Sequence, residues 1–394
     1  MTGIPVTELK NRHKRTQDYL KKNGVDGLLI LQNLDLYYYT HSMQTFAAYL
    51  PADGEILVFY KKATEKIQED CPLELYAVSS YRDIPGILKD KGCPIPEKMG
   101  LEHDVLPVKV YERVMKCFPG TTDVDESETI RKVRMIKSDF ELDIIRTAGK
   151  MNTEVFSALR DIIKPGMTEV EVAGEIEYLY RKKSHLGPTR MRSFNHELFF
   201  GHVLSGASAF TKTSFNSPLG GDGVHAAYGY GPSQKIINKD ETILIDYVSN
   251  YNGYHVDTTR TCVIGKVSAA LEKYYEKLQA VYSLIQSKIA PGVSCMDIYS
   301  DVMDFVISEK LEKNFMGYNG EHVAFIGHGI GIEIDEYPVI APRFDRKIEK
   351  NMVLAFEPKM FFPEEGVIGL EDTFIVTETG TEPVTHLDNS IIRI

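Results

Sequence analysis

Two acidic residues flank a predicted turn in the middle of the chain. The apolar stretch 243–245 ends at Asp246, the dipeptide Asn252-Gly253 follows, and Asp257 comes after it. An Asn-Gly dipeptide between two such runs is typical of a β-hairpin. The two acids lie almost symmetrically about it, so we expect them to face each other across antiparallel strands. Opposed Cβ atoms lie only about 5 Å apart, and two carboxylates there need a shared proton or a bound cation.

A second acidic pair follows the same pattern nearer the C-terminus. The apolar strand expected at 353–356 leads to Glu357, a turn is expected at 363–366, and Glu371 lies on the returning strand. Each pair is approached through apolar sequence, which predicts that the acids are buried. Buried carboxylates need protons or cations as compensation.

A histidine between glycines completes a donor set for metal ions. His328 stands in the segment Gly-His-Gly-Ile-Gly, where the glycines leave the imidazole unobstructed. Four carboxylates and one imidazole suit two divalent ions about 3.5–4 Å apart. Manganese is the ion that we expect, with cobalt, iron or zinc as alternatives. The competing interpretation is a set of surface acids and a loop histidine. The expected metal ligands are Asp246, Asp257, His328, Glu357 and Glu371.

Two similar halves of the chain position these residues. The segment Ile-Lys-Pro-Gly-Met-Thr at 163–168 is echoed by Ile-Ala-Pro-Gly-Val-Ser at 289–294. Each copy predicts a helix, a Pro-Gly break, and a Thr or Ser that caps the next helix. A Ser-x-x-Glu sequence at 138–141 predicts the helix that opens this part of the chain. We therefore expect a duplicated domain of α+β class over residues 137–394, holding the acids and the histidine.

The first part of the chain predicts a separate domain. Over residues 1–130, a helical stretch at 7–23 alternates with apolar strands at 27–31 and 55–60, which favours an α/β unit. No concentrated chemistry stands in this part. The charged stretch 123–137 is interpreted as the connector between the two domains.

Composition narrows the class of partner. The 394 residues include 45 Lys and Arg against 56 Asp and Glu, a formal net charge of −11. This charge disfavours nucleic acid and membrane partners and favours a small peptide or small molecule as substrate. The five cysteines lack Cys-x-x-Cys spacing, and no apolar run approaches the ~20 residues that span a bilayer. We expect a cytoplasmic protein with reduced thiols.

In order and type, these motifs resemble the pita-bread metallopeptidase superfamily, which includes methionine aminopeptidase, prolidase, aminopeptidase P and creatinase. The first part of the chain resembles the creatinase/prolidase branch. The resemblance implies a creatinase-like N-terminal domain, a pita-bread catalytic domain and a homodimer. The matching stretches are Leu-Ile-Asp at 244–246, Gly-Tyr-His-Val-Asp-Thr-Thr-Arg-Thr at 253–261, Gly-His-Gly-Ile-Gly at 327–331, Phe-Glu-Pro at 356–358 and Leu-Glu-Asp-Thr at 370–373.

The resemblance also implies a role for each ligand. Asp257 and Glu371 are expected to bridge two metal ions, with Asp246 completing one site. His328 and Glu357 are expected to complete the other site. The implied activity is that of a metal-dependent hydrolase similar to Xaa-Pro dipeptidases and aminopeptidases. In such a reaction a hydroxide between the two ions attacks an amide carbonyl, and Glu357 accepts the proton.

Three positions depart from the Xaa-Pro peptidase pattern. Such peptidases usually carry a His seven residues after the metal-binding His, where this chain has Asp335. A second His usually follows a Ser-Gly motif, whereas the motif at 205–206 runs into Thr-Lys-Thr at 211–213. The Arg that usually stands two residues before the last Glu is replaced by Gly369. Asp335 is expected to hold a cationic part of the substrate or to act as a base.

These departures keep other functions open. One is a lyase or small-amide hydrolase of the same fold, acting on a cationic metabolite with Asp335 as base or anchor. Another is a metal-free binding module. The Gly-rich, aromatic segment 216–233 is interpreted as a loop that lines the pocket, with His225 or Tyr228 replacing a lost donor. A flexible surface connection is the alternative for this segment.

Overall fold

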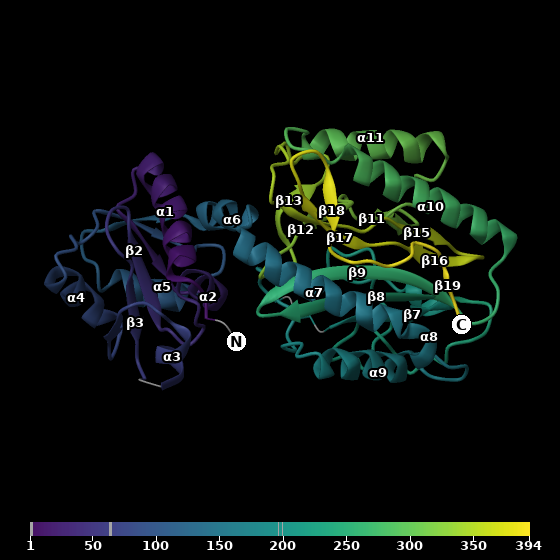
Figure 1. The fold of residues 1–394 in the computed structure, drawn as a ribbon, viewed down its shortest axis with the longest axis horizontal. Helices are drawn as coiled ribbons and strands as arrows, with labels where there is room; N and C mark the ends of the chain where they lie inside the picture. The colour runs from purple at the N-terminus through teal and green to yellow at the C-terminus, as the bar shows by residue number, and fades with distance from the viewer. Residues whose placement is uncertain (1–2, 63–64, 196, 199) are drawn as a thin grey trace. The chain divides into compact units, whose positions relative to one another are not determined.

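The chain forms two compact units. The computed structural model describes residues 3–62, 65–195, 197–198 and 200–394. One unit ends at Arg134, and the other runs from Met135 to Ile394. Figure 1 gives the order of the helices and strands along the chain. Within the described ranges, no helix combines the length and the apolar character needed to cross a membrane.

The N-terminal unit is built on one mixed sheet. Its strands are β1 (Gly27–Ile30), β2 (Ala47–Pro51), β3 (Leu57–Tyr60), β4 (Leu75–Ala77), β5 (Lys98–Leu101) and β6 (Thr122–Asp125), and its helices are α1 (Val6–Asn23), α2 (Asn33–Thr40), α3 (Glu65–Asp70), α4 (Ile84–Asp90), α5 (Val108–Met115) and α6 (Ser127–Met135). The strand order is β4-β3-β2-β1-β5-β6. β1 is antiparallel to β2 and parallel to β5. The predicted helix at 7–23 is confirmed as α1.

The charged stretch 123–137 is ordered structure and not a connector. Residues 122–135 supply β6 and α6. Ile130 and Val133 lie three residues apart on α6 and are fully buried, because residues at this spacing share one helix face. Arg134, near the end of α6, forms a buried ion pair with Asp35 at 2.9 Å. The interpretation as a connector is wrong because two apolar residues hidden among the charges bury one face of this helix.

The C-terminal unit contains two halves, each with long helices and antiparallel strands. The first half comprises α7 (Asp139–Ser157), α8 (Leu159–Ile162), α9 (Glu169–Lys182), β7 (Gly201–Ser205), β8 (Thr242–Tyr251) and β9 (Tyr254–Val263). The second half comprises α10 (Ala269–Lys288), α11 (Cys295–Ser308), β10 (Gly317–Tyr318), β11 (Glu321–His322), β12 (Gly327–Gly329), β13 (Glu336–Ile340), β14 (Val353–Phe356), β15 (Lys359–Phe362), β16 (Gly366–Gly369), β17 (Asp372–Val376), β18 (Thr381–Pro383) and β19 (Ile392–Arg393).

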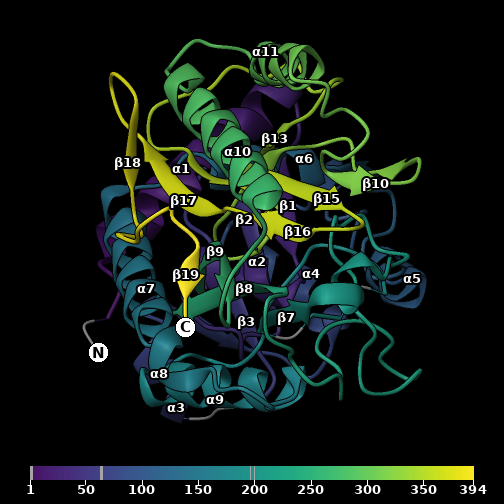
Figure 2. The ribbon, with the colours of Figure 1, turned by 90° about the vertical axis from the view of Figure 1, so that its right-hand side faces the viewer.

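The strands of this unit lie between two groups of helices. One sheet has the order β19-β9-β8-β7, another has the order β13-β12-β14-β17-β18, and β15 pairs with β16. Figures 1 and 2 show α7, α8 and α9 on one outer side of these strands and α10 and α11 on the other. The acid-bearing hairpins are therefore held in the interior of the unit.

The two halves repeat the same local construction. Thr168 and Ser294 cap α9 and α11 through their side-chain oxygens. Each follows a glycine in the left-handed region, Gly166 with φ 88° and Gly292 with φ 93°. Each capping residue also forms an isolated β-bridge with the segment before its acid-bearing hairpin. The repeat predicted from the sequence is a structural repeat.

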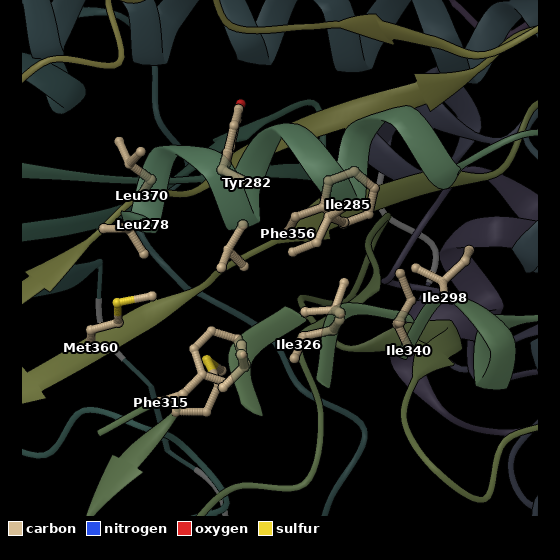
Figure 3. Packing of buried hydrophobic residues seen from close by; sticks show 14 of the residues in the cluster. Leu278, Tyr282, Ile285, Ile298, Phe315, Ile326, Ile340, Phe356, Met360 and Leu370 are labelled. Carbon is tan, nitrogen blue, oxygen red and sulfur yellow. The ribbon is translucent and has the colours of Figure 1, made fainter. Parts of the chain in front are cut away.

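A hydrophobic core lies between α10 and the strands of the second half (Figure 3). Side chains of α10 pack against Phe356 and Leu370, both fully buried. Side chains alternate between the two faces of an extended chain. Since Phe356 and Leu370 face the core, the next residues, Glu357 and Glu371, face the other way. The core thereby fixes the direction in which both glutamates point.

Candidate metal centre

Asp246 and Asp257 lie on the long hairpin of β8 and β9. The predicted turn is confirmed, because Asn252 and Gly253 have φ values of 47° and 84°, as a type I′ turn requires. Asp246 lies opposite Thr259, two residues beyond Asp257. The prediction that the two acids oppose each other directly is wrong, because the turn is centred one residue later than that pairing needs. Since strand side chains alternate, both acids still share one face as diagonal neighbours.

Glu357 and Glu371 lie in the short gap between two strand pairs. β14 pairs with β17, and β15 pairs with β16, in one continuous register. This register places Glu357 opposite Glu371, as the sequence predicted. The backbone N–H of Glu371 donates to the carbonyl oxygen of Thr259 on β9 at 3.1 Å, and the Thr259 hydroxyl donates to Glu371 Oε2 at 2.7 Å. These bonds join the two acid-bearing hairpins.

His328 lies on β12, between β13 and β14. A Cβ atom at Gly329 would collide with the backbone of Tyr337, so the glycine allows β12 and β13 to approach closely. His328 Nε2 lies 3.5 Å from Glu357 Oε1. His328 Nδ1 lies 3.3 Å from Asp335 Oδ1, whose side chain is half exposed. The imidazole thus has one nitrogen toward the buried acids and the other toward Asp335.

Three of the expected ligands form a group that fits one metal ion. Asp257, His328 and Glu371 are buried, and each offers a ligand atom within 4.8 Å of the others. Glu371 Oε1 is buried and has no hydrogen-bond partner among the described residues. A buried carboxylate oxygen without a partner costs free energy that a bound cation would recover. Two carboxylates and an imidazole suit a divalent ion.

A lysine that the sequence reasoning missed lies within the acidic cluster. Lys359 Nζ lies 2.8 Å from Glu357 Oε2, 3.1 Å from Glu371 Oε2 and 3.4 Å from Asp246 Oδ2. Its side chain is only 1% exposed. The turn that pairs Glu357 with Glu371 also pairs Lys359 with Gly369. The sequence carried two signs of this lysine: its pairing about the predicted turn, and its place as a lysine in an apolar hairpin.

The pKa values of the acids differ between the two sides of the cluster. Burial and the nearby Asp246 raise the pKa of Asp257 to about 8. Burial alone would raise the pKa of Glu357, but Lys359 and His328 outweigh it and hold this pKa at about 2. Burial lowers the pKa of Lys359, but the surrounding carboxylates raise it well above its ordinary value. The protein itself therefore neutralises Glu357, whereas the charge of Asp257 needs a proton or a cation.

The predicted substrate-binding residues are distributed differently from the metal ligands. Asp335 contacts His328 at the half-exposed side of the cluster. His225 Nδ1 accepts a hydrogen bond from the backbone N–H of Ala227, and the Tyr228 hydroxyl donates to the carbonyl oxygen of Glu197. Neither of these two contacts involves one of the four acids. The structure thus brings Asp335 to the cluster and places His225 and Tyr228 in loop contacts.

A cavity of about 320 Å³ lies beside the strand that carries Lys359. Phe361 of β15 and Met316 line it, and the backbone N–H of Met316 donates to the carbonyl oxygen of Lys359 at 2.9 Å. Part of the predicted pocket-lining segment, residues 216–218, contributes to the wall, whereas His225 and Tyr228 are not among the lining residues. A volume of this size is in the range of sites for small ligands.

Comparison with known proteins gives the same two-part organisation. The model of Metallopeptidase family M24 matches residues 143–378, and that of the Creatinase/Prolidase N-terminal domain matches residues 12–136. An Xaa-Pro dipeptidase of Pyrococcus furiosus is 25% identical, over 98% of this chain and 100% of its own length. The uncharacterized peptidase YqhT of Bacillus subtilis is 25% identical, over 94% of this chain and 96% of its own length.

Solved structures share the fold over almost the whole chain. The Xaa-Pro dipeptidase from Bacillus anthracis has a TM-score of 0.82 at 23% identity and covers 98% of this chain and 100% of its own. The X-Pro aminopeptidase from Thermotoga maritima has a TM-score of 0.79 at 22% identity, covering 97% and 99%. The solved structures confirm the predicted fold class, and the two family models confirm the predicted resemblance.

Proposed function

Because the chain belongs to metallopeptidase family M24 and is a metallohydrolase that uses divalent metal ions, we propose that it cleaves Xaa-Pro bonds in short peptides. The observation that carries the proposal is the buried group of Asp257, His328 and Glu371, with Glu357 3.5 Å from His328. Relatives that match nearly the full length are named Xaa-Pro dipeptidases, which supports the choice of substrate. Manganese, a homodimer and a cytoplasmic location are parts of the same proposal.

Asp257, His328 and Glu371 would hold the metal ion. When bound, a divalent ion supplies Lewis acidity, which activates water at neutral pH and polarises a carbonyl group. His328 Nδ1 lies 3.0 Å from the carbonyl oxygen of Gly329 and 3.3 Å from Asp335 Oδ1, and these two acceptors orient the imidazole toward the cluster.

Glu357 is the residue placed to move a proton. Its low pKa keeps it as a carboxylate at neutral pH. Glu357 Oε2 accepts a hydrogen bond from Lys359, whereas Oε1 lies on the side of His328. We assign to Oε1 the proton lost by the attacking water, which it then passes to the nitrogen of the leaving proline.

The cavity beside β15 suits a short, partly apolar peptide. Phe361 and Tyr318 line it together with Phe210, whose ring centre lies 6.2 Å and 6.1 Å from theirs. Aromatic walls can pack against a proline ring. Asp335, half exposed beside His328, is assigned the free ammonium group of the peptide.

The test is hydrolysis of Xaa-Pro dipeptides and tripeptides, with Xaa-Ala peptides as the comparison. Protein stripped of metal is loaded separately with manganese, cobalt, iron(II) or zinc. We expect cleavage only of the prolyl peptides and only with metal. Asp257→Asn should lose both bound metal and turnover, whereas Asp53→Asn, at a 94% exposed side chain, should keep both. Folded, metal-loaded protein that cleaves none of the peptides would reject this substrate.

A second candidate is a lyase or small-amide hydrolase acting on a cationic metabolite. It is favoured by Asp335, which adds a carboxylate beside His328 where Xaa-Pro peptidases usually have a histidine. The peptide panel separates the two candidates. If metal-loaded protein is inactive on every peptide but binds small quaternary or guanidinium compounds, and Asp335→Asn abolishes that binding, this second candidate replaces the first.

A further inference from the structure

The ammonium group of Lys359 occupies the interior of the acidic cluster. It lies within 3.4 Å of oxygens from Asp246, Glu357 and Glu371. We infer that this ammonium takes the place of one of the two metal ions expected from the ligand set, so that the centre binds a single divalent ion on Asp257, His328 and Glu371. The inference concerns the metal centre of the peptidase proposed above and changes its stoichiometry.

The two oxygens of Glu371 divide between the lysine and the metal group. Oε2 accepts hydrogen bonds from Lys359 and from Thr259. Oε1 is buried and has no hydrogen-bond partner among the residues that the structure describes. Oε2 is therefore committed to protein donors, and Oε1 is left for a metal ion. A second ion at Asp246 would have to share Oε2 with an ammonium of like charge.

The hairpin leaves room for the lysine at one position. Gly369 lies opposite Lys359 in the β15–β16 pair. A Cβ atom at Gly369 would lie 3.1 Å from Lys359 Cγ and 3.3 Å from Thr259 Cγ2, already tighter than ordinary van der Waals contact. A longer side chain at this position would compete with the lysine stem for this space. Gly369 therefore leaves the space that the stem of Lys359 occupies.

The lysine is held in this position by its surroundings. Its side chain is 1% exposed. Its backbone lies in a strand pair, and its carbonyl oxygen accepts a hydrogen bond from Met316. Swinging the side chain out of the cluster would leave Glu357 and Glu371 without their cation in a buried setting. The ammonium is therefore a fixed part of the centre and not a surface charge that happens to lie near it.

The experiment counts metal ions in the full-length protein without substrate. Metal-stripped protein is equilibrated with excess manganese, desalted, and analysed for manganese per chain by atomic mass spectrometry. Electron paramagnetic resonance then distinguishes isolated from exchange-coupled manganese. We expect one ion per chain with an uncoupled spectrum in the wild type. Lys359→Met should bind two ions with a coupled spectrum, and the matched control Lys350→Met, at an exposed lysine paired with Glu378, should bind one.

Several outcomes would overturn the inference. Two ions per chain in the wild type, or none, contradict it. A folded Lys359→Met protein that still binds only one ion would show that the lysine does not exclude the second. If circular dichroism shows that Lys359→Met does not fold, Lys359→Gln takes its place, and the wild-type count decides alone if that variant fails too. Because no peptide is present, one ion per chain without peptide cleavage would reject the proposed substrate and keep this inference.

Discussion

At the scale of single residues, a substitution of Glu357 tests proton transfer separately from metal binding. It accepts a hydrogen bond from Lys359 at 2.8 Å and lies outside the group formed by Asp257, His328 and Glu371. Glu357→Gln removes the proton acceptor and keeps the shape of the side chain. We expect kcat for an Xaa-Pro dipeptide to fall by about 10²–10⁴-fold, with manganese content per chain unchanged.

The control for this prediction is Glu364→Gln. Glu364 is exposed in the turn of the β15–β16 hairpin, so its amide should leave kcat and manganese content at wild-type values. Both quantities are measured on the same preparations, by steady-state kinetics and by metal analysis. Loss of manganese from Glu357→Gln would instead make Glu357 a ligand, as the family resemblance implied.

The sequence predicted which acids and which histidine lie together better than it predicted how the side chains around them are arranged. The acids and the histidine were expected together, and the structure groups Asp257, His328 and Glu371. Lys359 was missed because its pairing about the turn is predictable but the direction of its ammonium is not, since a lysine residue alone does not show whether it points into a cluster or into solvent. Only the register, which sets Lys359 opposite Gly369, gives its stem the space to turn inward.

At the scale of secondary structure, the core behind the strands sets the direction of the glutamates. Phe356 is fully buried, packs against α10, and stacks on Phe374 with ring centres 5.1 Å apart. Phe356→Ala leaves a cavity next to Glu357, and large-to-small changes of this kind cost about 3–5 kcal/mol. We expect a loss of this size in the free energy of unfolding, measured by urea denaturation followed by circular dichroism.

The same substitution on the surface provides the control. Phe194 has 85% of its surface exposed, so Phe194→Ala should change the free energy of unfolding by less than about 0.5 kcal/mol. A loss below about 1 kcal/mol in Phe356→Ala would mean that neighbouring side chains fill the space. The strand would then be positioned by its hydrogen bonds and not by this packing.

Capped helices and the Asn-Gly turn were predictable because local chemistry specifies them. Ser138 and Glu141 form the expected capping box at the start of α7. The pairing of Asp246 with Thr259 was not predictable to the residue, because a shift of the turn by one position changes every partner. Both acids still lie on one face, because side chains of a strand alternate with a period of two residues and the partner of Asp246 shifts by two residues.

At the scale of the C-terminal unit, the centre lies where the two halves of this unit meet. Thr259 and Arg260 come from the first half, and Glu371 and Asp372 come from the second. Arg260 is fully buried and donates both to the Glu371 carbonyl oxygen and, through Nη2, to the Asp372 carboxylate. A duplicated unit thus brings its two acidic hairpins together around one centre, and neither half holds the complete set of ligands.

We expect protonation of a buried histidine, His185, to contribute to the loss of this unit's stability in acid. His185 donates from Nε2 to the carbonyl oxygen of Val248 at 3.0 Å and accepts at Nδ1 from the backbone N–H of Gly187 at 2.9 Å. Both nitrogens are therefore satisfied in the neutral form. Burial lowers the pKa of His185 to about 4, against about 6.5 in the unfolded chain.

The unfolded state therefore binds more protons than the folded state between pH 6.5 and pH 4. Stability contributed by neutral His185 is fully present above pH 6.5 and is lost as the pH falls toward 4. We expect this residue to account for up to about 2 kcal/mol of the decrease in the free energy of unfolding between pH 7.5 and pH 5. In His185→Gln, the difference in the free energy of unfolding between the two pH values should be smaller than in the wild type by this amount. Urea denaturation at each pH measures it. The control is His386→Gln, at an exposed histidine, which should keep the wild-type difference. An unchanged pH dependence in His185→Gln would mean that the wild-type histidine is protonated without cost in the folded unit.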